Sequence, residues 1–253
     1  MSTIQLGGCA GAHHYMFGVG AYIEESYIID TSTRLRSISA SNFVCAAILS
    51  TRSTRSISQL WSRRLADLRR HRPWTGLYYL SAMMEDHIRH VLQFCTLERS
   101  KQHHIRITVL DTLRSIWAHD HTNLLDYCNA LQAGAFLPGI CGRFWYMFRN
   151  RRCVDGGLPK IQFYRNKPAV VDTISISVFD SPTISKWYML WLIVYGIWSS
   201  TGHHDLQFAL GYAHARDVLQ PSLDKLLVRR ESPLRKLAIE GGVRWDQTNR
   251  TFT

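Results

Sequence analysis

Near the start of the chain, short segments of alternating apolar and polar residues are each followed by a longer stretch of helical periodicity. Residues 2–6 (STIQL) predict a strand that runs into two glycines, and residues 13–26 place small and apolar side chains on one helix face. Residues 34–39 again alternate like a strand, and residues 40–50 predict a second helix. This order is typical of an α/β fold with a mostly parallel sheet covered by helices.

The same alternation continues through the rest of the chain. A helix over residues 56–72 is expected to end at Pro73, and β-branched residues predict a strand over 105–110, with which residues 113–117 can pair. No internal repeat or linker divides the chain. Further helices are predicted over 77–97, 123–135, 185–199, 204–219 and 223–239, and further strands over 152–155 and 172–179.

The composition fits a folded domain with an excess of positive charge. A chain of 253 residues suits one large domain, and 46% hydrophobic residues can build a substantial core. The formal net charge of +11 favours anionic partners, either nucleic acid or anionic membrane surfaces. The basic run at residues 63–72 lacks a surrounding nucleic-acid module and interleaved aromatic residues. Nucleic acid is therefore disfavoured, and a solvated helix face or a membrane contact is expected.

The N-terminus and the apolar segments indicate the cellular compartment of the protein. The first residues carry no basic side chain, and no segment reaches the roughly 18 apolar residues of a membrane-spanning helix. We therefore expect a cytoplasmic protein that is not secreted. Residues 187–198 (WYMLWLIVYGIW) predict a core helix, with a lid or interfacial segment as the alternative. No secretion signal is found and no CxxC pair is present, so reduced thiols, mostly in the core, are expected at Cys9, Cys45, Cys95, Cys128, Cys141 and Cys153.

The first of three motifs with chemical potential is GGCAGA, residues 7–12, between a predicted strand and a predicted helix. Free backbone N–H groups at a helix start bind a phosphate or a developing oxyanion. A dinucleotide site would require G-x-G-x-x-G with an acidic residue about 20 positions later. Ala10 and His13 break that pattern.

The second motif is SISAS, residues 37–41, where a nucleophile elbow of the form G-x-S-x-G would lift Ser39 out of the sheet. The third is VDGGLP, residues 154–159, which places Asp155 at a strand end before two glycines. Each motif alone has an ordinary interpretation as a turn or loop. Adjacent histidine pairs lack the i, i+4 spacing of helical metal ligands, so no metal and no cofactor is predicted.

In this order, the three motifs resemble those of the patatin-like phospholipases, most closely the branch of adipose triglyceride lipase and adiponutrin. The first loop of that branch reads G-C-G-x-x-G-x-Y-x-x-G-V, and Gly8, Cys9, Tyr15, Gly18 and Val19 keep its register. The later segments AGAFLPGICG, CVDGGLP, TISISVF and GYAHARDVL also resemble segments of the family.

The resemblance implies a three-layer α/β/α patatin-like sandwich over residues 1–220, followed by a basic C-terminal extension over residues 221–253. It implies a Ser–Asp dyad, with Ser39 as nucleophile and Asp155 as base. The implied substrates are lipid esters, either phospholipid or triacylglycerol, at a peripheral membrane or lipid-droplet surface.

Two further sets of residues would assist this dyad on the strength of the resemblance. The oxyanion hole would be formed by the backbone N–H groups of Gly7, Gly8, Cys9 and Ala10. The elbow and the turn after the base would be supported by Ser37, Ser41, Gly156 and Gly157.

The chain departs from the family at four glycine positions, which are occupied by Ala10, His13, Ser37 and Ser41. Alanine and serine are small enough for these positions but lose glycine's free access to positive φ, at a cost of about 1 kcal/mol or more where that conformation is required. The alternative function is therefore a catalytically inactive patatin-like protein that binds lipid surfaces or a protein partner.

Overall fold

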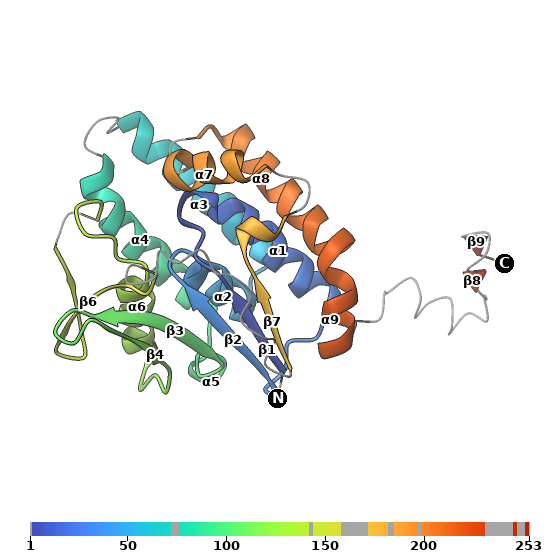
Figure 1. The fold of residues 1–253 in the computed structure, drawn as a ribbon, viewed down its shortest axis with the longest axis horizontal. Coiled ribbons are helices and arrows are strands. Elements are labelled where there is room, and N and C mark those ends of the chain that lie inside the picture. The colour runs from blue at the N-terminus through green and yellow to red at the C-terminus, as the bar shows by residue number, and fades with distance from the viewer. Residues whose placement is uncertain are drawn as a thin grey trace.

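The computed structural model has an α/β fold in which helices lie along a seven-stranded sheet (Figure 1). It describes residues 2–71, 76–141, 144–157, 172–181, 185–196, 199–230, 245–246 and 251–252. The strands are β1 (Ser2–Leu6), β2 (Thr33–Ile38), β3 (His103–Val109), β4 (Arg114–Ala118), β5 (Tyr146–Phe148), β6 (Arg151–Asp155), β7 (Thr173–Ile176), β8 (Trp245–Asp246) and β9 (Thr251–Phe252). The longer helices are α1 (His13–Ser26), α2 (Ser41–Leu49), α3 (Thr54–His71), α4 (Gly76–Leu92), α6 (Leu124–Gly134), α7 (Lys186–Tyr195) and α8 (Thr201–His214). The shorter ones are η1 (Ala10–Ala12), α5 (Leu97–Ser100), η3 (Val178–Asp180), η5 (Ala215–Leu219) and α9 (Gln220–Leu226).

The sheet is parallel where the sequence predicted it and antiparallel at one side. Its strand order is β5-β6-β3-β2-β1-β7, with β4 also paired to β3. Strand β1 pairs in parallel with β2 and with β7, and β2 pairs in parallel with β3. Strands β4 and β6 run antiparallel to β3. The predicted α/β class is confirmed.

The pairing of β3 brings the end of β6 next to the end of β2. Residues 105–106 of β3 pair with both β2 and β4, and residues 107–109 pair with both β4 and β6. Because a strand has only two edges, β2 and β6 must share the edge opposite β4. Ile38 pairs with Arg106 and Asp155 pairs with Ile107. Ser39, which follows Ile38, therefore emerges beside Asp155.

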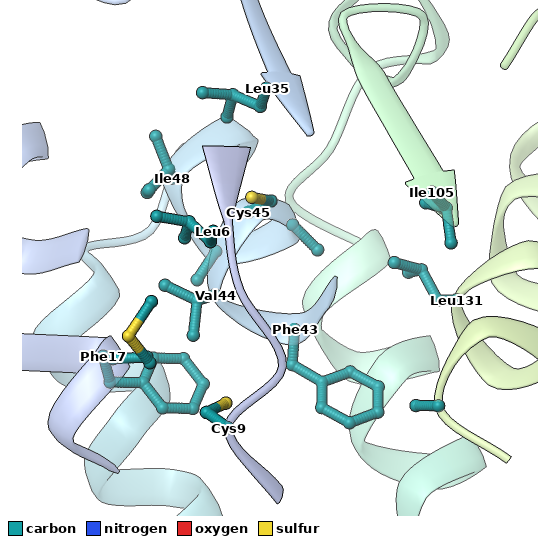
Figure 2. Packing of buried hydrophobic residues seen from close by; sticks show 14 of the residues in the cluster. Leu6, Cys9, Phe17, Leu35, Phe43, Val44, Cys45, Ile48, Ile105 and Leu131 are labelled. Atoms are coloured by element: carbon teal, nitrogen blue, oxygen red, sulfur yellow. The ribbon is translucent and has the colours of Figure 1, made fainter. Parts of the chain in front are cut away.

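Alternation along the strands separates a buried face from a more polar one. Ile4, Leu6 and Leu35 are fully buried on the face that carries the core. Figure 2 shows Leu6 and Val44 in the packed cluster between β1 and α2. The intervening strand residues, such as Gln5 and Arg36, are only partly buried. This period of two is the pattern from which the strands were predicted.

Where the elements differ from the predictions, the reason is local. The strand expected over 172–179 ends at Ile176, because Ser177 begins a capping box with Asp180. The helix expected over 77–97 ends at Leu92. Strand β5 was not predicted, because three residues carry too short a pattern.

The chain continues to pack against the domain beyond residue 220, where the domain was expected to end. Leu223 of α9 is fully buried, Ser2 Oγ donates to Leu226 O at 2.8 Å, and Arg230 N–H donates to Ser26 O at 2.9 Å. The first part of the predicted extension over 221–253 is thus packed with the domain. Residues 231–239 of the helix predicted over 223–239 lie outside the described residues.

The prediction of a core helix at residues 187–198 does not hold over the first turns of α7, where Trp187 is 81% exposed and Leu190 and Trp191 are each 44% exposed. The side chains of residues 192–195 lie outside the description. Residues 197–198 lie outside the described residues. None of the helices in the described ranges has the length and apolar character needed to cross a membrane.

Candidate active site

Ser39 occupies the tight turn between β2 and α2 in a conformation that serine rarely adopts. Its φ is 62°, in the left-handed region, and Asn42 N–H donates to Ser39 O at 2.9 Å to close the turn. Such a conformation costs a non-glycine residue of the order of 1–3 kcal/mol and persists only where the surroundings enforce it. A serine held this way at a strand-to-helix turn has the geometry of a nucleophile elbow.

Ser37, which was expected only to fit a crowded glycine position, is the centre of a buried polar network. Its hydroxyl donates to Asn42 Oδ1 at 2.6 Å and accepts from His103 Nε2 at 2.6 Å. His103 Nδ1 in turn accepts from the Tyr127 hydroxyl at 2.7 Å. Burial lowers the pKa of His103 well below its usual range, so the ring is neutral with its proton on Nε2. The network fixes the start of α2 beneath Ser39.

Ser41, at the other elbow position, ties α2 to the glycine loop. Its hydroxyl donates to Gly7 O and also lies 3.3 Å from Cys9 Sγ. Both elbow serines therefore supply hydrogen bonds that glycine could not make. This physical reason for serine at positions 37 and 41 was not visible in the sequence.

Asp155 is a buried carboxylic acid with an unusually high proton affinity. Burial raises its pKa from 3.8 to about 6, against the lowering effects of Ser39, of the Gly157 N–H and of the charge on Arg106. Gly157 N–H donates to Asp155 Oδ1 at 2.6 Å. Ser39 lies close enough to Asp155 to lower its pKa, but the contact is looser than an ordinary hydrogen bond. Among the described residues, Asp155 Oδ2 has no partner of full hydrogen-bond geometry. Loose contacts of this kind are common in catalytic pairs without substrate.

The turn that carries Asp155 depends on glycine. A Cβ on Gly156 would lie 2.2 Å from Arg106 O, which is far inside van der Waals contact. A Cβ on Gly157 would lie 3.1 Å from Asp155 Oδ1. The two glycines allow the chain to pass close to β3 and hold the carboxylate beside the elbow, as the sequence predicted for the turn.

The glycine loop presents backbone N–H groups next to Ser39. Gly8 lies against this serine, since a Cβ on Gly8 would be 3.6 Å from Ser39 Cβ. Across the described parts of the chain, no backbone carbonyl accepts from the N–H of Gly8, Cys9 or Ala10. The prediction for Gly7 does not hold, because its N–H donates to Ile176 O at 2.8 Å and so completes the pairing of β1 with β7.

Ala10 and His13 show how the loop keeps its shape with larger residues at two positions where glycine was expected. Ala10 has a φ of 38°, which glycine would adopt at lower cost. His13 lies at the start of α1, where Trp61 Nε1–H donates to its Nε2 at 2.6 Å and its Nδ1 lies 3.1 Å from Ala10 O. Burial lowers the pKa of His13 to about 3, so this ring is a neutral donor to Ala10 O. The support from His13 and Trp61 was missed, since it joins residues far apart in sequence.

An apolar pocket of about 40 Å³ opens beside Ser39. Helices α3 and α4 supply Trp61, Leu65, Leu80 and Met84 to its wall. Cys141 also lines the pocket, and burial raises the pKa of its thiol to about 11. Since the thiolate is the reactive form of cysteine, Cys141 is not activated at neutral pH, which leaves Ser39 as the pocket hydroxyl that lies beside a buried carboxyl group.

No protein-family model matches this chain, and no curated protein matches it either.

Proposed function

We propose that this protein is a patatin-like lipid acyl hydrolase in which Ser39 and Asp155 form a catalytic dyad. The observation that carries the proposal is the left-handed Ser39 at a strand-to-helix turn, beside a buried Asp155 whose pKa is raised to about 6. The order of strands, helices and motifs supports membership of the family with a three-layer α/β/α sandwich. On this proposal the substrate is a lipid ester, and the reaction needs no cofactor.

In the proposed reaction, Ser39 Oγ attacks the ester carbonyl while Asp155 takes the hydroxyl proton. The tetrahedral oxyanion is stabilised by the N–H groups of Gly8, Cys9 and Ala10, and collapse releases the alcohol with the proton from Asp155. Water then attacks the acyl-enzyme, gives its proton to Asp155 and releases the fatty acid as Ser39 recovers its proton. The carboxylate must be ionised at the start, so activity rises as the pH rises through about 6.

The pocket beside Ser39 suggests the acyl group that is accepted most easily. Its lining is mostly apolar, and its volume of about 40 Å³ is a few times the roughly 10–15 Å³ that one water requires. A short acyl group therefore fits this space, whereas a long chain exceeds its volume. We expect faster hydrolysis of a butyrate ester than of the matching palmitate ester.

A fluorophosphonate probe tests the proposal, because it reacts with an activated serine. Wild-type protein should be labelled and should hydrolyse nitrophenyl butyrate and a phospholipid, whereas Ser39→Ala should do neither. Ser56→Ala is the matched control, since Ser56 is exposed and should leave labelling unchanged. Equal labelling of wild type and Ser39→Ala would exclude Ser39 as the nucleophile. Absence of labelling in the wild type would favour an inactive lipid-binding relative.

A further inference from the structure

Among the side chains of helix α7 that the structure describes, the largest apolar ones face outward. Trp187 is 81% exposed, and Leu190 and Trp191 are each 44% exposed, whereas Met189 is 99% buried. The three outward residues are spaced i, i+3 and i+4, so they share one helix face. A helix that serves the core has the opposite arrangement. Clustered apolar exposure of this kind marks an interaction surface.

The end of α7 packs against the glycine loop. The chain leaves α7 at Gly196, where a Cβ would lie 2.2 Å from the carbonyl oxygen of Gly11 in the glycine loop. Figure 1 shows α7 beside α8, above the sheet end at which β1 runs into this loop. The Tyr188 hydroxyl lies 2.8 Å from His203 Nε2, which anchors α7 to the first turn of α8.

An arginine-rich helix lies alongside. Helix α3 contains five arginines and one aspartate. Its Ser62 Oγ lies 2.8 Å from His204 Nδ1, and the charge of Arg69 helps to lower the pKa of His204, after the larger effect of burial. Because His203 contacts α7 and His204 contacts α3, the two helices flank the same turn of α8. Arg69 therefore places positive charge near the turn of α8 that also contacts α7.

We infer that the outward face of α7, together with α3, is a docking surface for an anionic lipid bilayer. Tryptophan side chains favour the headgroup level of a membrane, and each basic side chain near anionic lipid contributes about 1 kcal/mol. The net charge of +11 adds long-range attraction. The consequence for catalysis rests on the proposed function: docking would bring lipid esters to the side of the domain where α7 meets the glycine loop. The docking itself does not depend on that function.

Flotation with lipid vesicles tests the surface. One set of vesicles is phosphatidylcholine alone, and the other contains about 30 mol% phosphatidylserine. We expect full-length protein to bind the anionic vesicles, and the double variant Trp187→Ala, Leu190→Ala to bind them at least about tenfold more weakly. The matched control is Leu113→Ala, Val228→Ala, which removes side chains that are 73% and 67% exposed elsewhere. The control should bind like the wild type.

The two proposals fail in distinguishable ways. Ser39→Ala should still float with anionic vesicles, and the α7 double variant should still react with the fluorophosphonate probe and hydrolyse soluble nitrophenyl butyrate, which also shows that it is folded. Failure of the wild type to bind anionic vesicles would overturn the docking surface, as would equal loss in both double variants. Dimers in light scattering that vanish in the α7 variant, without any vesicle binding, would instead assign this face to a second copy of the chain.

Discussion

The elbow and the candidate reaction centre are adjacent, but they differ in how well their buried polar atoms are hydrogen-bonded. In the elbow, Ser37 bonds to both Asn42 and His103, and Ser41 bonds to the glycine loop. In the centre itself, Asp155 Oδ2 has no well-formed partner within the described residues. An unpaired buried polar atom costs roughly 1–3 kcal/mol. The comparison indicates that the elbow is built for stability, while the centre keeps capacity for a substrate.

The largest expected effect comes from removing the charge at the centre. Asp155→Asn keeps an oxygen that can accept from Gly157 N–H but cannot take the Ser39 proton. By analogy with other serine hydrolases, the rate of ester hydrolysis should fall by about 10⁴-fold. The wild-type rate should rise with pH through about 6, the pKa raised by burial of Asp155, and this rise should be absent from the residual rate of Asp155→Asn.

A surface variant on the same side of the sheet serves as the control for that measurement. Asp111 is exposed and pairs with Arg152 at 2.5 Å. Asp111→Asn should retain the wild-type rate and pH profile. A similar loss of rate in both variants would show that Asp155 acts only through the fold.

The same substitution should stabilise the folded protein while it removes activity. The folded pKa of Asp155 is raised from 3.8 to about 6, so its contribution to stability is present below pH 3.8 and is lost as the pH rises through about 6. This rise corresponds to roughly 3 kcal/mol at neutral pH. Asp155→Asn should therefore unfold at a higher denaturant concentration than the wild type at pH 8, with little difference near pH 4. A loss of stability at pH 8 would contradict the burial cost assigned to Asp155.

A substitution in the elbow should lower the stability of the folded protein instead of raising it. Ser37→Ala leaves His103 Nε2–H and Asn42 Oδ1 without their partner, and both groups are buried. The free energy of unfolding should fall by about 2 kcal/mol. Ser115→Ala, at a partly exposed serine of β4, should change it by less than about 0.5 kcal/mol. Equal effects in chemical denaturation would mean that the buried network adds no stability.

The contrast between the two regions also shows what the sequence could and could not predict. The short period of two in β1 and β2 and the helical period in α1 and α2 are local, so these elements were predicted within a few residues. The proximity of Ser39 and Asp155 was expected from the resemblance. The structure adds its physical reason, which is that β2 and β6 share one edge of β3.

Features that depend on distant partners could not be predicted. The elbow motif and the resemblance indicated special turns at Ser39 and Ala10, but neither residue is a glycine, and only the structure establishes their positive φ. The bond from Trp61 to His13 joins residues 48 positions apart. The apolar sequence of α7 was consistent with a core helix, and only the packed structure places Trp187 at the surface. An apolar run specifies a helix more readily than it specifies the environment of that helix.

The smallest expected effect is a change in stability that tests whether Ala10 strains the glycine loop. Ala10 has a φ of 38°, where an L-residue is strained by roughly 1–2 kcal/mol, whereas glycine adds flexibility to the unfolded chain worth about 0.4–1 kcal/mol. Ala10→Gly should therefore stabilise the fold by about 0.5–1 kcal/mol in chemical denaturation and leave the loop N–H groups in place. Ala209→Gly, in the exposed middle of α8, has ordinary helical geometry and should destabilise by about 1 kcal/mol. If both variants lose stability alike, the positive φ at Ala10 carries no strain, and the bond of His13 to Ala10 O must hold the loop in a conformation that alanine already prefers.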